Sequence, residues 1–584
     1  MCKSLSIFNL LAGKVLLPLF CLMIIIPAAA RASEPPVRIA VLGDRYSGED
    51  KGVFGKIVRE IDLLQPDLVL HVGDIIDSWG DSLEIIGQWN GLDSVIAPLD
   101  VPLYGPPGNN DIWDNISEKI YVARYGSAYG STDFDGIHIV MLDNSRWENE
   151  DFPAEQLEWL EADLEKNQNA RYTFVLMHKP FWYAALGEGK TDPFHDIFVK
   201  YGVDAVFSGH YHEYFSGTYD GIKYTGVGSS GGGADTSPNG LKYHFLWVTV
   251  DDKDINIATI KKDAVLPWDN ITAAERLVFR PLRQTGLTFV NQAIVAEDMT
   301  IPETRIGLQI NNSVNPMAIN DTLRWNVPEG WSVEPAVMPL VVAPKAIDMV
   351  YFTIAGSGSL FPVPSVSAKL DYAANKKVAV AKNLGTARIA VCNPVEKKVK
   401  IDGDLSEKCW QNAETRFFAP DGGKPAAEPV EFYFAYDKNN LFLAAKCSES
   451  MMDSLRAKAA EHDGAVHRDD CVGYFIAPDY ALDTFYQIYF NPAGIAYDVK
   501  YWMNNDGYLD GSLEWNGQYE VKSAKNADSW TIEIKMPLKQ FGVQLEQGKK
   551  MHVNFRRKQL RLGNADWITP IEYDPNYYGQ LIMR

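Results

Sequence analysis

The sequence contains little cysteine, and its cysteines follow no metal-binding pattern. Only six of 584 residues are cysteine, and two of them lie within the first 32 residues. The other four lie in the last third of the chain: Cys392, Cys409, Cys447 and Cys471. They lack the paired spacing of a zinc site. In an exported protein they predict one or two disulfides, and buried free thiols are the alternative.

Long apolar runs are also scarce. Residues 15–26 form the one nearly continuous run, and it is short for a span of about 20 residues. Lys3 gives the segment before it a positive charge, and Ala30 and Ala32 supply small residues for a cut after position 32. Residues 1–32 therefore predict a cleavable signal peptide. We expect a secreted or periplasmic protein with no stable membrane span after cleavage.

Positive charge is in short supply, since the formal net charge is −21. Such a charge repels nucleic acid and anionic membranes, so we expect neither as a partner. It does not exclude an anionic substrate, because bound metal ions invert the local field. A nucleotide P-loop is also absent, because no Gly-Lys-Ser/Thr follows the glycine-rich run at residues 228–233.

The first half of the chain does contain polar motifs at the ends of predicted strands. Residues 35–262 alternate between apolar strands and amphipathic helices, and open α/β sheets build their sites at the carboxyl ends of strands. The motifs are Gly43-Asp44-Arg45-Tyr46, Gly73-Asp74-Ile75-Ile76-Asp77, Gly108-Asn109-Asn110-Asp111, His178, and Gly209-His210-Tyr211-His212. Carboxylates, an amide oxygen and imidazoles suit two divalent or trivalent ions such as Mn, Fe, Zn or Ni.

This order of motifs resembles the calcineurin-like metallophosphoesterase superfamily. The resemblance implies an α/β domain with two β-sheets flanked by helices. It also implies hydrolysis of phosphate mono- or diesters by a metal-bound hydroxide. The metal ligands that it implies are Asp74 as the bridge, Asn109, His178 and His210 on one ion, and Asp44 and His212 on the other.

Two positions depart from the family pattern. Tyr46 stands where the family usually has a histidine, so it is either a phenolate ligand or no ligand. Asn110 replaces the histidine that assists the leaving group. An amide donates a hydrogen bond but gives up no proton at neutral pH. We therefore expect poorer catalysis on esters whose leaving groups have a high pKa.

Four further residues are candidates for catalysis or substrate binding. Arg45 would hold phosphate in a bidentate manner, or would instead pair with a carboxylate such as Asp77. Asp111 would orient its neighbours or serve as a turn residue. Trp182 and Tyr211 would contact the organic part of the substrate, and core packing is the alternative for such aromatic residues.

The region after residue 262 is richer in short strands and turns. We expect a linker at residues 263–284, which contain Pro267 and Pro281. An immunoglobulin-like β-sandwich at 285–388 would follow and act as a spacer. Together with the final segment, this gives a multidomain protein with two antiparallel β-sandwich modules behind the α/β domain.

The last segment, residues 389–584, resembles carbohydrate-binding module family 9. The resemblance rests on motifs that include Ile401-Asp402-Gly403-Asp404-Leu405, Asn491-Pro492-Ala493-Gly494 and Tyr578-Gly579. It implies an antiparallel β-sandwich with a carbohydrate ligand and calcium. Sugar-stacking candidates are Tyr501, Trp502 and Trp515, and an adhesion or packing role is the alternative.

The sequence thus predicts an exported phosphoesterase that its last module directs to glycans. The alternative is a carbohydrate-binding surface protein with a degenerate phosphoesterase domain. A glycosidase fits poorly, because no second domain supplies a scaffold of paired carboxylates. The nearly complete ligand set favours an active enzyme.

Overall fold

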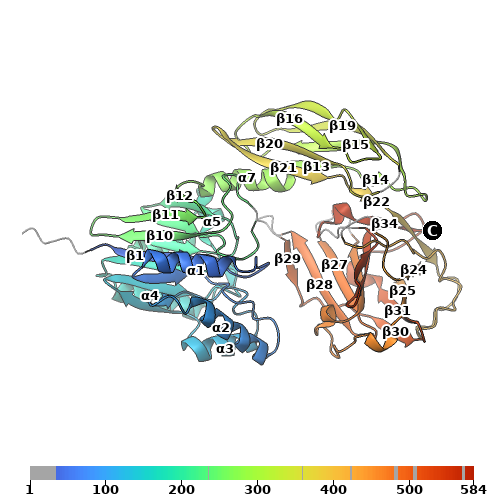
Figure 1. The fold of residues 1–584 in the computed structure, drawn as a ribbon, viewed down its shortest axis with the longest axis horizontal. Coiled ribbons are helices and arrows are strands. Elements are labelled where there is room, and N and C mark those ends of the chain that lie inside the picture. The colour runs from blue at the N-terminus through green and yellow to red at the C-terminus, as the bar shows by residue number, and fades with distance from the viewer. Residues whose placement is uncertain are drawn as a thin grey trace, which may run out of the picture.

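The computed structural model describes residues 35–234, 236–357, 360–420, 424–478, 484–503, 509–568 and 573–584. The predicted signal peptide, residues 1–32, lies outside the described residues. An α/β domain is followed by two β-modules, and Figure 1 shows all three. No helix in the described ranges is both long and apolar enough to cross a membrane.

Two six-stranded sheets form the α/β domain. The first has the order β12 (Ala264–Pro267), β11 (Ile255–Lys261), β10 (His244–Val250), β1 (Val37–Leu42), β2 (Leu68–His71) and β3 (Leu103–Tyr104). The second has the order β4 (Gly130–Phe134), β5 (Ile137–Leu142), β6 (Tyr172–Met177), β7 (Ala205–Ser208), β9 (Ile222–Gly226) and β8 (Phe215–Tyr219). Strands β1, β2 and β3 are parallel, as are β5, β6, β7 and β9.

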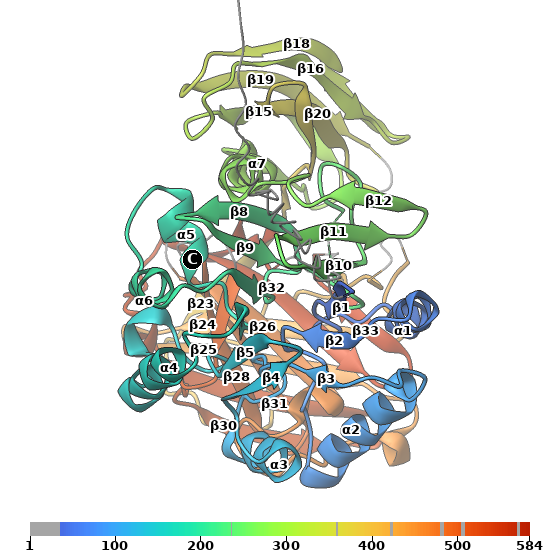
Figure 2. The same cartoon turned by 90° about the vertical axis from the view of Figure 1, so that its left-hand side faces the viewer.

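Helices cover the outer faces of both sheets, as Figure 2 shows. They are α1 (Val53–Leu64), α2 (Ser82–Ile96), α3 (Asn115–Tyr125), α4 (Ala154–Lys166), α5 (Trp182–Gly187) and α6 (Pro193–Tyr201). In β1, Ile39 and Val41 belong to the core between the sheets, whereas Ala40 and Leu42 pack with α1 and α2. Burial on both faces explains why these strands read as continuous apolar runs. The predicted fold of two sheets flanked by helices is confirmed.

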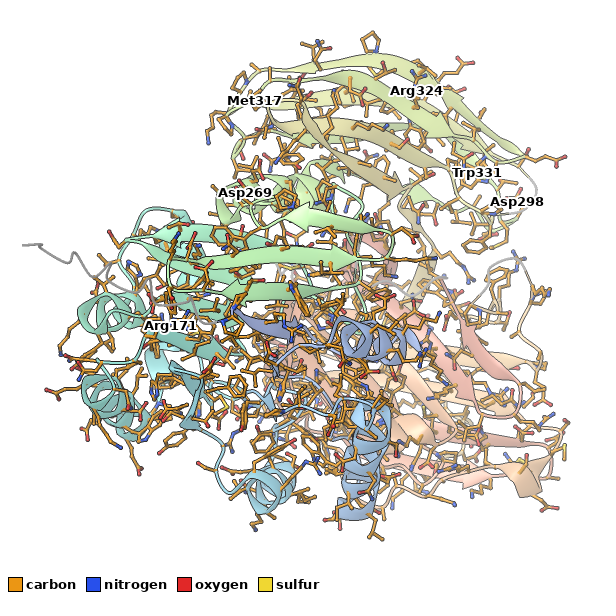
Figure 3. All side chains as sticks on the ribbon, turned by 60° about the vertical axis from the view of Figure 1, so that its left-hand side comes forward. Arg171, Asp269, Asp298, Met317, Arg324 and Trp331 are labelled. Atoms are coloured by element: carbon orange, nitrogen blue, oxygen red, sulfur yellow. The ribbon has the colours of Figure 1, made fainter. Side chains whose placement is uncertain are left out.

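The stretch expected as a linker is instead folded. Residues 264–267 form β12 at the edge of the first sheet, and α7 (Ala273–Thr285) follows. A capping box explains where α7 begins, because Thr272 and Glu275 satisfy each other's backbone N–H groups. The two prolines, at 267 and 281, had suggested a break. Figure 3 labels Asp269, just before α7, between the α/β domain and the middle module.

The middle module is the expected β-sandwich. One sheet consists of β13 (Leu287–Phe289), β15 (Ile301–Asn311), β19 (Ile347–Gly356) and β17 (Trp331–Glu334), and the other of β18 (Val337–Val342), β16 (Ile319–Asn326), β20 (Ser365–Ala373) and β21 (Lys376–Asn383). Burial alternates along β20, as in a strand with one face on the core. A short parallel pair, β14 (Ala293–Ile294) with β22 (Thr386–Ala387), leads to the last module.

The last module is a second β-sandwich. Its strands are β23 (Ile389–Pro394), β24 (Val430–Tyr436), β25 (Asn440–Ser448), β26 (Cys471–Ala477), β27 (Thr484–Phe490), β28 (Ala496–Met503), β29 (Leu509–Ser512), β30 (Glu520–Lys525), β31 (Ser529–Pro537), β32 (Lys550–Gln559), β33 (Gly563–Asp566) and β34 (Gly579–Met583). Strand β23 pairs in parallel with both β24 and β34 and so joins the two sheets. The other described strand pairs of this module are antiparallel, as expected.

The expectation of disulfides in this module was wrong. Cys392, Cys409, Cys447 and Cys471 are all free thiols. Three of them are buried on strands, where they act as small apolar core residues. Burial raises the pKa of Cys447 and of Cys471 to about 12. These thiols are therefore poor nucleophiles at neutral pH.

A buried histidine in the second sheet gives the α/β domain a pH-dependent stability. The ring nitrogens of His138 each lie 2.8 Å from a carboxylate, one of Asp133 and one of Asp163. Burial lowers the pKa of His138, but the two carboxylates outweigh it and raise the pKa above 6.5. The stabilisation is therefore complete below about pH 6.5 and is lost as the pH rises through the folded-state pKa.

We expect His138→Gln to remove this loss of stability. The free energy of unfolding of the variant should fall less than that of the wild type between about pH 6 and pH 9. Urea titrations at several pH values would measure it. Asp163→Asn should flatten the profile in the same way, since it removes one partner. A variant that kept the wild-type slope would contradict the assignment.

Candidate metal centre

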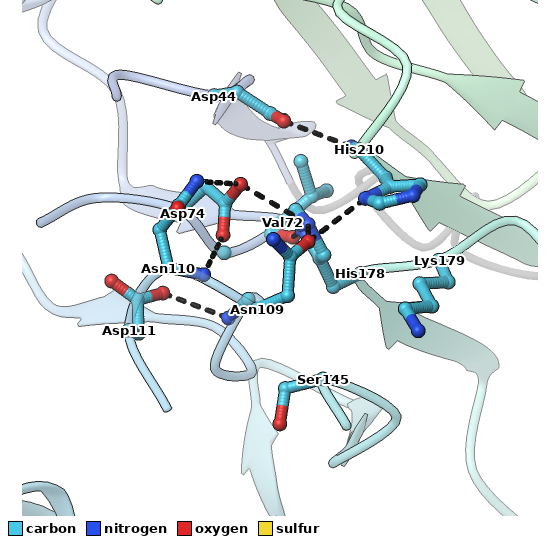
Figure 4. Close-up of polar contacts among 12 residues, drawn as sticks. Asp44, Val72, Asp74, Asn109, Asn110, Asp111, Ser145, His178, Lys179 and His210 are labelled. Carbon is cyan, nitrogen blue, oxygen red and sulfur yellow. Dashed lines mark hydrogen bonds and ion pairs between the residues drawn. The ribbon is translucent and has the colours of Figure 1, made fainter. Parts of the chain in front are cut away.

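The polar motifs converge at one edge of the two sheets. Asp44 follows β1, Asp74 follows β2, and Asn109 lies in the loop after β3. His178 follows β6, and His210 follows β7. These residues lie far apart in the chain, but Figure 4 shows their side chains gathered around a common centre.

Glycines in these motifs let the backbone approach the carboxylates. A Cβ atom on Gly108 would lie 2.1 Å from Asp74 Oδ1, and one on Gly209 would lie 2.3 Å from Asp44 Oδ1. No side chain fits at those distances. The Gly-Asn and Gly-His pairs of the sequence are thus a steric requirement of the centre.

Asn109 joins two imidazoles. Its Oδ1 lies 2.9 Å from His178 Nε2 and 2.9 Å from His210 Nδ1. His178 Nε2 is also 3.3 Å from Asp74 Oδ2. Three potential ligands from three loops, together with Asp74, therefore face one another. This is the arrangement expected for one metal ion and its bridging carboxylate.

The orientation of His178 is fixed from behind. Its Nδ1 lies 2.8 Å from the Val72 carbonyl oxygen, and its backbone N–H donates to Asn144 Oδ1 at 2.9 Å. With Nδ1–H donating to a carbonyl, Nε2 presents its lone pair to the centre. Burial lowers the pKa of His178, but Asp74 outweighs it and raises the pKa to about 9. A metal ion must therefore displace a proton here.

A second cluster consists of Asp44, Asp74 and His212. One possible ligand atom from each lies within 4.8 Å of the others. His212 Nε2 is 3.2 Å from Asp44 Oδ2, and its Nδ1 bonds the carbonyl oxygen of Gly233. Asp44 Oδ1 is buried and has no hydrogen-bond partner among the described residues. A buried carboxylate oxygen needs a cation or a donor, so the residues fit a second metal ion.

Three of the candidate ligands have strained backbones. Asp74, His210 and His212 adopt φ values of 53°, 72° and 53°. The left-handed region costs a residue other than glycine about 1–2 kcal/mol. Such conformations persist only where the surrounding structure enforces them, and they are concentrated at functional sites.

Asn110 and Tyr46, which depart from the family pattern, and the neighbouring Arg45 have clear partners. Asn110 donates its backbone N–H and its Nδ2 to the two oxygens of Asp74, at 2.8 and 2.7 Å. Arg45 donates to the Ile75 carbonyl at 3.3 Å and lies over the ring of Tyr46. Its nearest carboxylate partner is that of Glu49, at 4.0 Å. Burial raises the pKa of Tyr46, which favours the neutral phenol.

The remaining candidates lie around this centre rather than within it. Asp111 accepts hydrogen bonds from three backbone N–H groups beneath the site. Trp182 is 1% exposed and donates to Ser208 Oγ within the core. Tyr211 is partly buried and stacks against the guanidinium of Arg276 at 4.7 Å. Arg276 had no signal in the sequence.

The sugar-stacking candidates occupy different faces of the last module. Tyr501 stacks on Phe485, with ring centroids 5.0 Å apart. Trp502 is the next residue on β28 and therefore points to the opposite face. Trp515 packs against Tyr486 at 4.4 Å. A separate group of His462, Asp463 and Asp498 could hold a cation, but an imidazole is an unusual calcium ligand.

The two sheets and the convergent Asp, Asn and His side chains give the first domain the fold and the candidate metal site of a metallophosphoesterase. Residues 37–214 match the family model for calcineurin-like phosphoesterases, and residues 401–583 match that for carbohydrate family 9 binding domain-like proteins. The chain therefore contains a calcineurin-like phosphoesterase domain and a domain like those of carbohydrate-binding family 9. The first is related to acid phosphatases.

Individual relatives cover only parts of this chain. Purple acid phosphatase 22 of Arabidopsis thaliana is 29% identical over 204 residues, 31% of this chain and 45% of its own length. The human serine/threonine-protein phosphatase CPPED1 is 25% identical over 223 residues, 34% of this chain and 71% of its own length. The chain thus spans less than half the length of the plant phosphatase.

A solved structure resembles the last module. It is a carbohydrate-binding module of family 9 from Caldicellulosiruptor kristjanssonii in complex with glucose. It is 14% identical, covers 33% of this chain and 95% of that chain, and has a TM-score of 0.24.

Proposed function

We propose that this protein hydrolyses phosphate mono- or diesters with two metal ions. The observation that carries the proposal is the buried Oδ1 of Asp44, which has no partner in the described part of the chain and lies beside the Asn109, His178 and His210 group. Asp74 lies between the two groups, 3.3 Å from His178 and within the Asp44–His212 cluster. A degenerate domain would not be expected to keep so complete a set of candidate ligands.

Asn109, His178, His210 and Asp74 would hold one ion, and Asp44, His212 and Asp74 the other. Bound in this way, two ions would polarise the phosphoryl group and activate water at neutral pH. Backbone and side-chain groups around the centre would hold the candidate ligands in place. Asn110 fixes both oxygens of Asp74, and Val72 fixes the ring of His178. No histidine stands at position 110 to protonate the leaving group, so we expect aryl esters to react faster than alkyl esters.

The metal content of the purified protein tests this function. We expect two ions per chain, by elemental analysis, and hydrolysis of aryl phosphate mono- and diesters with added Mn²⁺. Chelation should abolish turnover, and adding metal back should restore it. A protein that bound no metal and turned over neither ester would contradict the proposal and favour a surface protein that only binds carbohydrate.

We further propose that the protein is exported and that its last module binds a glycan. The signal-like residues 1–32 and the family 9 match support this. A cavity of about 920 Å³ lies between the middle and last modules, and Phe485, Met503 and Tyr573 are among its lining residues. Tyr501 packs against two of these lining residues. The centroid of its ring lies 5.0 Å from that of Phe485 and 5.5 Å from that of Tyr573. Aromatic faces of this kind stack on sugar rings.

Tyr573→Ala should weaken glycan binding by roughly fivefold, because a stacking ring contributes on the order of 1 kcal/mol. A glycan array with the full-length protein would identify a ligand, and calorimetry would measure its affinity. Tyr433→Ala, on strand β24 and outside this cavity, is the matched control. Equal affinities in both variants would place the glycan site elsewhere.

A further inference from the structure

The residue after the last metal-ligand candidate takes part in a buried ion cluster. Glu213 follows His212 and is 6% exposed. Its Oε2 accepts from Arg276 Nε at 2.9 Å, and its Oε1 accepts from Arg280 Nη1 at 3.0 Å and from Arg283. All three arginines belong to α7, the helix in the stretch that the sequence had marked as a linker.

The spacing of the arginines explains how one helix reaches one carboxylate. Residues 276, 280 and 283 are four and three apart and so share a helix face. Arg276 is 1% exposed, and its guanidinium lies 4.7 Å from the ring of Tyr211, the residue between His210 and His212. The same guanidinium packs on Phe215 at 4.8 Å. Arg276 thus contacts the residues that precede and follow Glu213 in the loop.

The segment before α7 holds the same loop from its other end. Ser216 donates its backbone N–H to the Ile271 carbonyl at 3.0 Å and its hydroxyl to the Trp268 carbonyl at 2.9 Å. The Tyr214 hydroxyl also bonds the Trp268 carbonyl. Residues 213–216 are therefore fixed to residues 268–283 by contacts that are buried or partly buried. Upstream, the His210 backbone N–H donates to Asp44 Oδ2 at 2.9 Å.

We propose that Glu213 and Arg276 are positioning residues for the metal centre. The ion pair fixes the loop in which His210 and His212 hold their left-handed backbones, so the affinity of the Asp44–His212 site for metal depends on α7. This inference rests on the proposed metal-dependent function and adds residues that touch neither metal nor substrate.

The side of α7 next to these arginines packs on the middle module. Phe279 lies edge-on to Tyr372 at 5.3 Å, and Lys376 Nζ pairs with Glu275 Oε1 at 2.5 Å. The middle module therefore contacts the helix that fixes the histidine loop, and it is more than a spacer.

A cobalt(II) titration of the metal-free, full-length protein tests the proposal. Glu213→Gln keeps the shape of the side chain and removes its charge. We expect it to weaken one of two cobalt sites by about 10- to 100-fold, as loss of outer partners typically does, and to shift the visible absorption bands of that site. Arg276→Lys keeps the positive charge and should therefore weaken that cobalt site less than Glu213→Gln does. Arg556→Lys, in the partly buried Arg556–Asp566 pair of the last module, is the matched control and should change neither the affinity nor the spectrum.

Hydrogen exchange of the metal-free protein gives a second measurement. Peptides covering residues 209–216 should exchange faster in Glu213→Gln, whereas those covering β1 should not. Wild-type cobalt affinity, spectrum and exchange in Glu213→Gln would overturn the proposal. If the wild type itself bound no cobalt, the proposed metal-dependent function would be wrong, and so would the positioning role of Glu213 and Arg276. If Glu213→Gln did not fold, Arg283→Met, which removes a more exposed partner of the same carboxylate, would replace it in both measurements.

Discussion

Asp74→Asn should reduce kcat/KM for aryl phosphate esters by roughly 10³-fold, because a metal pair supplies several kcal/mol of transition-state stabilisation. Asp74 is 2% exposed, lies 3.3 Å from His178 and also belongs to the Asp44–His212 cluster. Both of its oxygens accept from Asn110. An asparagine would turn its NH₂ group toward one of these donors and would carry no charge for the metals.

Steady-state kinetics and metal content of the same preparation would measure this effect. We expect the variant to lose metal along with activity. Asp77→Asn is the matched control, because Asp77 lies three residues further along the same loop and is only half-buried. It should retain both ions. An Asp74→Asn variant with near wild-type turnover would show that hydrolysis takes place without this centre.

The convergence of the candidate ligands was predictable from sequence for a physical reason. Parallel strands bring their carboxyl ends to one edge, so short polar motifs after successive strands must meet. Gly108 and Gly209 add a second signal, because the backbone approaches the carboxylates too closely there for any side chain. Local sequence therefore encoded most of the site.

The surroundings of the site were not predictable in this way. Glu213 and Arg276 are 63 residues apart, and no local pattern links them. The prolines at 267 and 281 suggested a linker, yet the capping box at Thr272 and the buried Arg276 outweigh them. Tertiary contacts of this kind override local propensity.

The aromatic residues of the last module show a similar limit. Tyr501 and Trp502 are adjacent in sequence and looked equivalent, but alternation along β28 separates them onto two faces. Trp515 is packed against Tyr486. Which aromatic side chain faces a ligand depends on strand register, and single-sequence patterns do not fix register in a module so rich in aromatics.

Asp111→Ala should destabilise the α/β domain by about 3 kcal/mol or more. The Asp111 carboxylate is 1% exposed and accepts from the backbone N–H groups of Gly108, Ile75 and Ile76, at 2.8 to 3.0 Å. Alanine would leave all three donors buried without partners, and each unsatisfied group costs about 1–3 kcal/mol. Asp111→Asn should cost less, because its Oδ1 still accepts from Ile75 and Ile76 while its amide faces Gly108.

Asp114→Ala provides the matched control, because this aspartate also accepts backbone N–H groups but does so at the more exposed start of α3. Loss of an N-cap should cost only about 1 kcal/mol. Urea titration followed by hydrogen exchange in peptides from β1 and β2 would report on the α/β domain alone. Equal losses in Asp111→Ala and Asp114→Ala would mean that the loops carrying Asp74 and Asn109 are held mainly by other contacts. A much larger loss in Asp111→Ala would identify its carboxylate as the group that joins these two loops beneath the metal centre.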